Sequence, residues 1–121
     1  MSAAKARGTA AESAVVAYLR ENGFPFAERR ALSGNLDKGD ITGTPGLAWE
    51  IKAGKAIQHR AWLRECAVEK GHAGADFCPL VIKPVGYGET RTGEWYAMLT
   101  LADLVHLLRA AGYGEPLGRA A

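Results

Sequence analysis

In the segment Leu47–Lys52, the apolar residues Leu47, Trp49 and Ile51 alternate with Ala48, Glu50 and Lys52, and this alternation constrains the fold more than any other feature. Successive side chains of a β-strand point to opposite faces of the sheet. One face of this predicted strand therefore carries Trp49 and Ile51, and the other carries Glu50 and Lys52. The carboxylate and the ammonium group start about 6.6 Å apart along the strand. Such a strand buries its apolar face against a core and leaves a charged pair on the opposite face.

Short helical and strand patterns, separated by Gly and Asn, precede and follow this strand. Val15, Val16 and Leu19 have helical spacing, and Asn22-Gly23 is typical of a helix end. The expected elements are a helix over 3–21, strands over 24–32, 37–42 and 47–52, a helix over 57–70, strands over 79–83 and 95–99, and a helix over 100–111. This order predicts an α/β fold, a short mixed sheet flanked by helices with an extra C-terminal helix.

Length and composition fit one globular domain. The 121 residues are 48% hydrophobic and 23% charged, which excludes wholesale disorder, and we expect a single domain over 1–111 and a flexible tail over 112–121. No apolar run approaches the ~20 residues of a membrane span, and no secretion signal is evident at the start. The two cysteines form no disulfide framework, so we expect a cytoplasmic protein, and the Ala/Gly-rich composition suits a bacterial or phage gene.

The charge is distributed unevenly along the chain. The net charge of +2 excludes a histone-like polycation. Residues 1–70 nevertheless hold 11 of the 15 Lys and Arg residues and 8 of the 13 Asp and Glu residues. This excess favours either a phosphate-binding face or an ordinary mixed surface.

Asp40 and Glu50 are the candidates for a shared acidic site. The Gly43–Gly46 turn predicts an antiparallel hairpin that brings Asp40 back beside Glu50. Adjacent carboxylates repel each other unless a cation lies between them, and Mg²⁺ binds one or two carboxylates together with water and substrate phosphate. Lys52 would position or deprotonate an attacking water, or offset developing charge. The alternative is a surface hairpin with ordinary cross-strand charge pairs.

Glu12 lies on the apolar stripe of the first predicted helix, three, four and seven residues before Val15, Val16 and Leu19. An inward carboxylate is costly unless it is paired or bound to a metal. Glu12 therefore either joins the acidic site, or lies at the edge of the stripe and pairs with Arg29 or Arg30.

The ordered motifs of the chain resemble those of the PD-(D/E)xK nuclease superfamily, and most of all the archaeal-type Holliday junction resolvases. The resemblance covers roughly residues 5–99 and implies a restriction-endonuclease-like core of αβββαβ order. Gly39 stands where the superfamily name has Pro. The matching motifs are Gly8-x-x-x-Glu12, Gly23-Phe24, Arg29-Arg30, Ser33-Gly34, Gly39-Asp40-Ile41 and Glu50-Ile51-Lys52.

The resemblance also implies a metal site and its chemistry. Asp40, Glu50 and the Ile51 carbonyl would hold Mg²⁺, with Mn²⁺ as a substitute. Lys52 would be the catalytic lysine, and Glu12 would complete the site. The reaction would be phosphodiester hydrolysis by a metal-activated water.

DNA contacts would come from basic residues around this site. By resemblance, Arg29 or Arg30 would contact a phosphate near the scissile bond, with Ser33 beside it. Arg60 and Arg64 are i,i+4 neighbours that either grip a backbone together or pair with acids such as Glu65. The other expected DNA-binding residues are Lys5, Arg7, Lys38, Lys55 and His59.

The expected function is therefore that of a structure-selective DNA endonuclease, a Holliday junction resolvase that acts on four-way junctions as a homodimer. The dimer face would be the helix with Leu101–Leu108 or the strand with Trp95-Tyr96, although both also suit an ordinary intramolecular core. The alternatives are another repair or restriction-type nuclease of the superfamily and a non-catalytic nucleic-acid-binding module. Cys66, His72 and Cys78 match the spacing of no common zinc module.

Overall fold

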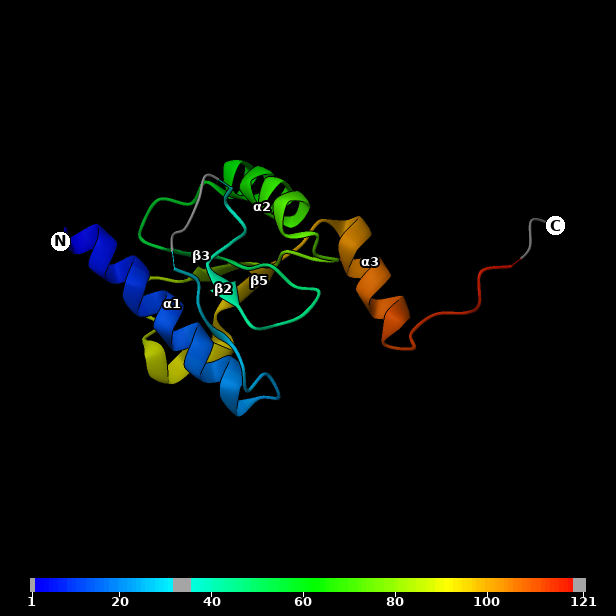
Figure 1. Ribbon diagram of the computed structural model, residues 1–121, viewed down its shortest axis with the longest axis horizontal. Helices are drawn as coiled ribbons and strands as arrows, with labels where there is room; N and C mark the ends of the chain where they lie inside the picture. The colour runs from blue at the N-terminus through cyan, green and yellow to red at the C-terminus, as the bar shows by residue number, and fades with distance from the viewer. Residues whose placement is uncertain (1, 32–35, 119–121) are drawn as a thin grey trace.

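The computed structural model describes residues 2–31 and 36–118, which form a mixed α/β architecture in the predicted order (Figure 1). A 3₁₀ helix, η1, fills the Gly-rich connection between the last two strands. The elements are α1 (Ala3–Glu21), β1 (Glu28–Arg29), β2 (Ile41–Thr42), β3 (Glu50–Ala53), α2 (His59–Ala73), β4 (Leu80–Lys83), η1 (Glu89–Glu94), β5 (Tyr96–Met98) and α3 (Leu101–Ala110). The strands are shorter than predicted. The difference is largest for the strand predicted over residues 24–32, where only β1 forms.

Local signals set the ends of the first helix. The Ser2 side chain accepts a hydrogen bond from the backbone N–H of Lys5 and caps the start of α1. Asn22 caps the other end, and Gly23 follows with φ of 100°, a left-handed conformation that glycine adopts without a steric penalty. The predicted helix end is therefore confirmed.

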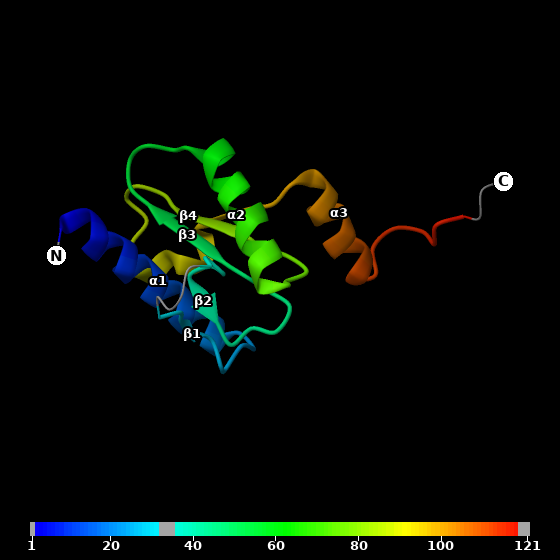
Figure 2. The same cartoon turned by 45° about the horizontal axis from the view of Figure 1, so that its top comes forward.

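The main sheet has three strands and is mixed, as predicted. β3 pairs parallel with β4, placing Glu50 opposite Leu80, and β4 pairs antiparallel with β5. A parallel pair requires a crossover connection, and α2 supplies it (Figure 2).

The predicted hairpin between the second and third strands is wrong in its pairing. β2 pairs with β1 in a separate two-stranded sheet, and the backbone N–H of Arg30 donates to the Asp40 carbonyl at 2.9 Å. The N–H of Asp40 still donates to Trp49 O at 2.7 Å. This bond does not extend into a ladder of backbone hydrogen bonds. The next donor, the N–H of Ile51, bonds to the Asp40 side chain and not to a backbone carbonyl.

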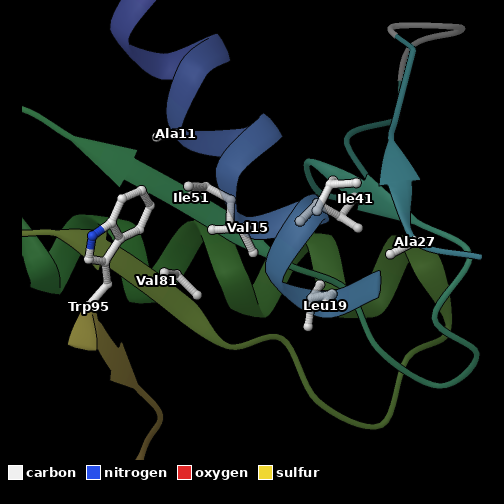
Figure 3. Close-up of a cluster of buried hydrophobic side chains, with 9 residues drawn as sticks. Ala11, Val15, Leu19, Ala27, Ile41, Ile51, Val81 and Trp95 are labelled. Carbon is white, nitrogen blue, oxygen red and sulfur yellow. The ribbon is translucent and has the colours of Figure 1, made fainter. Parts of the chain in front are cut away.

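The alternation predicted for β3 divides the core into two layers. Ile51 faces α1 and packs in a cluster that includes Val15 and Trp95, as Figure 3 shows. On the opposite face, Leu80 of β4 packs with Cys66 of α2. The two helices therefore cover opposite faces of the sheet (Figure 1). Glu50 and Lys52, which alternate with Ile51, lie on the α2 side.

α3 leaves its apolar face uncovered. Thr100 caps this helix by accepting a hydrogen bond from the N–H of Asp103 at 3.2 Å. None of its residues is buried, and Leu104 and Leu108 are each 40% exposed. The helix lies to one side of the sheet, with the chain end leading away from it (Figure 1). This helix therefore contributes no buried residue to the core.

The helices were also compared with the requirements of a membrane span. Within residues 2–31 and 36–118, none of them combines the length and the hydropathy that a transmembrane segment needs.

Candidate metal centre

Asp40 is held against the start of β3 by its own side chain. Its Oδ2 accepts a hydrogen bond of 2.7 Å from the backbone N–H of Ile51. Because Glu50 N donates to Pro79 O on the β4 side, the N–H and C=O of the next residue, Ile51, point to the opposite edge of the strand. The Ile51 carbonyl therefore faces the edge on which Asp40 lies.

Burial and crowding make these carboxyl groups unusually weak acids. Burial, followed by the charge of nearby Glu50, raises the pKa of Asp40 to about 8. Burial and the neighbouring Glu69 carboxyl raise the pKa of Glu50 to about 8. A divalent cation would reverse both effects, because it replaces lost hydration and offsets the repulsion.

Lys52 lies beside the acids on the α2 side of the sheet. Its Nζ is 3.6 Å from Glu50 Oε1 and 3.0 Å from Glu65 Oε2, and it lies 5.8 Å from the centre of the Trp62 ring. Burial lowers the pKa of Lys52, but the contacts with Glu65 and Glu50 outweigh burial, and the pKa is raised. Lys52 is therefore a cation at neutral pH.

Two further acids, which sequence reasoning missed, meet Glu50 on its α2 side. Carboxylate oxygens of Asp37, Glu50 and Glu69 all lie within 4.8 Å of one another. Glu69 is fully buried, and burial raises its pKa to about 7. The sequence held one signal for it: Glu69 stands three residues after Cys66 and seven after Trp62, on the inner stripe of α2.

Glu12 pairs with Arg29, which is one of the two alternatives predicted for it. Its Oε1 accepts a hydrogen bond of 3.1 Å from Arg29 Nε, and it lies outside the group of Asp37, Glu50 and Glu69. Its charge still contributes to the raised pKa of Asp40. Burial is the largest cause of that shift, and the charge of Glu12 is the smallest. Glu12 therefore acts on the acidic site through charge and holds an arginine beside it.

The predicted DNA-binding residues divide into four sets. Arg7 and Lys55 meet Lys83, which the sequence did not single out, in a pocket of about 540 Å³ at the ends of β3 and β4. Arg29 is paired with Glu12, whereas Arg30 Nε is buried without a hydrogen-bond partner among the described residues. Ser33 lies outside the described residues. The side chains that are simply exposed are Lys5, Lys38, His59, Arg60 and Arg64.

The alternative pairing of Arg60 or Arg64 with Glu65 does not occur, because Glu65 contacts Lys52 instead. Arg64 lines a second pocket, of about 430 Å³, together with Asp37, Glu65 and Glu69.

The cysteines and His72 do not form a metal site. Cys66 and Cys78 are both buried, and neither is in a disulfide. His72 Nδ1 lies 2.9 Å from the backbone oxygen of Asp37. Among the residues that the structure describes, Asp37, Glu50 and Glu69 are the one group of three or more potential ligands within 4.8 Å of each other.

Comparison of the chain with protein-family models, curated proteins and solved structures finds no match. Carboxylate oxygen ligands in a buried location suit a hard divalent cation such as Mg²⁺ or Mn²⁺.

Proposed function

We propose that this chain is a metal-dependent DNA endonuclease with a restriction-endonuclease-like core, and that its substrate is a branched DNA such as a four-way junction. One observation carries the proposal: the Asp40 carboxylate is fixed by Ile51 N at the strand that also presents Glu50 and Lys52. This is the arrangement that the motif resemblance implies, reached through a side-chain hydrogen bond and not through the expected hairpin.

The residues fit a divalent cation. Asp40 is held by the Ile51 N–H at the strand edge that the Ile51 carbonyl also faces, and Glu50 supplies a buried carboxylate. When bound there, Mg²⁺ would activate water and stabilise charge on a phosphoryl group. Asp40 and Glu50 would hold the cation, and their pKa values of about 8 in its absence reflect burial first and the neighbouring carboxyl groups second.

Lys52 stabilises the transition state as a cation. Its raised pKa favours positioning the attacking water and offsetting developing negative charge over removing a proton. Glu65 and Glu50 hold its ammonium group from two sides. The Trp62 ring restricts it further through a cation–π contact.

The pocket of Arg7, Lys55 and Lys83 would hold the DNA backbone. It lies at the ends of β3 and β4, directly after the strand that carries Glu50. No acidic residue lines it, although Lys83 Nζ lies 3.9 Å from Glu89 Oε1. Contacts of this kind bind phosphates without reading bases, as recognition of DNA shape requires. Of the two candidate arginines, Arg30 is the one that no ion pair occupies among the described residues.

A second copy of the chain would supply the second active site. One nuclease core cuts one strand, and resolution of a junction needs two symmetric cuts. The exposed apolar face of α3, with Leu104 and Leu108, is the surface we propose for the homodimer.

Cleavage of labelled four-way junctions tests the function, with linear duplex of the same sequence as the comparison. With Mg²⁺ or Mn²⁺, the wild type should cut the junction in preference, and Asp40→Asn and Glu50→Gln should retain binding without cutting. Glu21→Gln, which removes an exposed carboxylate at the end of α1, is the matched control and should cut normally.

The remaining outcomes separate the alternatives. Equal cutting of duplex and junction indicates another repair or restriction-type nuclease of the superfamily. Binding without cutting by the wild type, with either metal, indicates a nucleic-acid-binding module. Cutting by both acid variants at the wild-type rate excludes Asp40 and Glu50 as the site.

A further inference from the structure

Two acids on the α2 side of Glu50, Asp37 and Glu69, take no part in the proposed nuclease site. We propose that Asp37, Glu50 and Glu69 form a binding site for a hard divalent cation, with Glu69 of α2 as its buried ligand. The site brings together a loop residue, a strand residue and a helix residue whose carboxylate oxygens lie within 4.8 Å of one another.

The environment of the Glu69 carboxylate indicates that a ligand binds there. The residue is fully buried, and its Oε1 has no hydrogen-bond partner among the described residues. Its other oxygen, Oε2, has only the weak donor Cys78 Sγ, at 3.8 Å. An unpartnered oxygen in the interior costs free energy, and a bound cation would remove that cost.

The charges around the group favour a cation over an ion pair or a shared proton. No Lys or Arg pairs with Asp37 or Glu69 among the described residues, and Lys52 contacts only Glu50 of the three. One proton neutralises one carboxylate, whereas a divalent cation neutralises two and coordinates all three. Carboxylate oxygens are the ligands that Mg²⁺, Mn²⁺ and Ca²⁺ share.

The group has a built frame and a route from solvent. Asp37 Oδ1 accepts a hydrogen bond of 2.9 Å from Gly39 N, and Asp37 O lies 2.9 Å from His72 Nδ1 on α2. These contacts hold the loop against the helix that carries Glu69. The pocket of about 430 Å³ gives an ion access, and three acids, Asp37, Glu65 and Glu69, line it together with one base, Arg64.

Binding of Mn²⁺ to the full chain, measured by titration calorimetry, tests the site. We expect Glu69→Gln and Asp37→Asn each to weaken Mn²⁺ binding by about tenfold or more, since each removes one charged ligand. Glu21→Gln should bind as the wild type does. Because Asp37 is exposed, Asp37→Asn should fold even if the buried Glu69→Gln does not, and circular dichroism checks both.

The proposal is overturned if either variant, shown to be folded, binds as many Mn²⁺ ions as the wild type with an affinity within twofold of it. It is also overturned if only Asp40→Asn loses Mn²⁺, because the cation then lies on the other side of Glu50. Cation binding does not depend on the proposed nuclease activity. If every DNA substrate stays uncut while Glu69→Gln and Asp37→Asn lose Mn²⁺, the nuclease proposal fails and this site stands.

Discussion

The Asp40 carboxylate accepts a 2.7 Å hydrogen bond from the backbone N–H of Ile51, so one side chain both closes the edge of β3 and places an acid beside Glu50. The bond links the loop before β2 to β3, an edge strand of the three-stranded sheet. The same carboxylate therefore has a structural role and a proposed chemical one, and substitutions can separate the two.

Asp40→Ala should lower the free energy of unfolding by about 1–3 kcal/mol, because it leaves the Ile51 N–H without its acceptor. Asp40→Asn keeps an oxygen acceptor and should cost less. Urea denaturation of both variants in EDTA measures the difference. If the two variants lose the same free energy of unfolding, the hydrogen bond from the Ile51 N–H does not contribute to stability.

Lys52→Met should slow junction cleavage by about 10²–10⁴-fold, as expected for loss of a positioned charge at the reacting group. The methionine retains much of the apolar stem that lies near Trp62, so the fold should survive. Single-turnover cleavage with saturating enzyme gives the rate. A variant that cuts as fast as the wild type would remove Lys52 from the mechanism.

The metal-free protein should lose stability as the pH rises from about 5 to 8. Unfolded carboxyl groups titrate near 4, whereas the pKa is about 8 for folded Asp40 and Glu50 and about 7 for Glu69. Over this interval the folded state holds protons that the unfolded state has released, so the stability falls, by at most about 1.4 kcal/mol per pH unit for each such proton.

Thermal melts in EDTA at several pH values measure this slope. Addition of Mn²⁺ should flatten it, since a cation replaces the protons. A stability that rises with pH in EDTA over the same range contradicts the assignment of buried, mutually repelling acids.

Gly43→Ala should destabilise the fold by more than about 2 kcal/mol. The residue has φ of 85°, and an added Cβ would lie only 1.8 Å from the backbone oxygen of Phe26, so the backbone itself must move. Gly8→Ala is the contrasting variant. Gly8 lies within α1 with open space around it, and alanine there should stabilise the protein by about 0.5–1 kcal/mol.

Leu104→Gln together with Leu108→Gln should change the stability of the monomer by less than about 0.5 kcal/mol, because neither residue is buried. The same pair should abolish the proposed dimer, which light scattering after size-exclusion chromatography detects. Leu80→Ala is the contrast within the core. That residue is fully buried, and its truncation should cost about 2–5 kcal/mol.

Much of the local structure could be predicted because it depends on neighbours along the chain. The alternation in β3 placed Ile51 on one face and Glu50 and Lys52 on the other, and the Lys52–Glu50 contact of 3.6 Å confirms it. The caps of α1 and α3 follow from single residues, Asn22-Gly23 and Thr100. Helix and strand periods fix which side chains share a face, and a few residues suffice to define them.

Pairing over longer distances needed the tertiary structure. The turn at Gly43–Gly46 indicated a hairpin, but β2 joins β1, and the side chain of Asp40 replaces the expected backbone acceptor at Ile51. A local turn pattern does not say which of two edges a strand pairs with, since that depends on what already occupies the other edge.

The sequence by itself determined that Glu50 and Lys52 share a face, that Ile51 belongs to the core, and where α1 ends. Only the tertiary structure decided that Asp37 and Glu69, 32 residues apart in the sequence, meet at Glu50, and that α3 lies uncovered. The physical reason is that helical spacing places Glu69 on the inner stripe of α2 but does not say what that stripe packs against. The position of α2 across the sheet is set by the packing of Cys66 and Leu80, which no local pattern specifies.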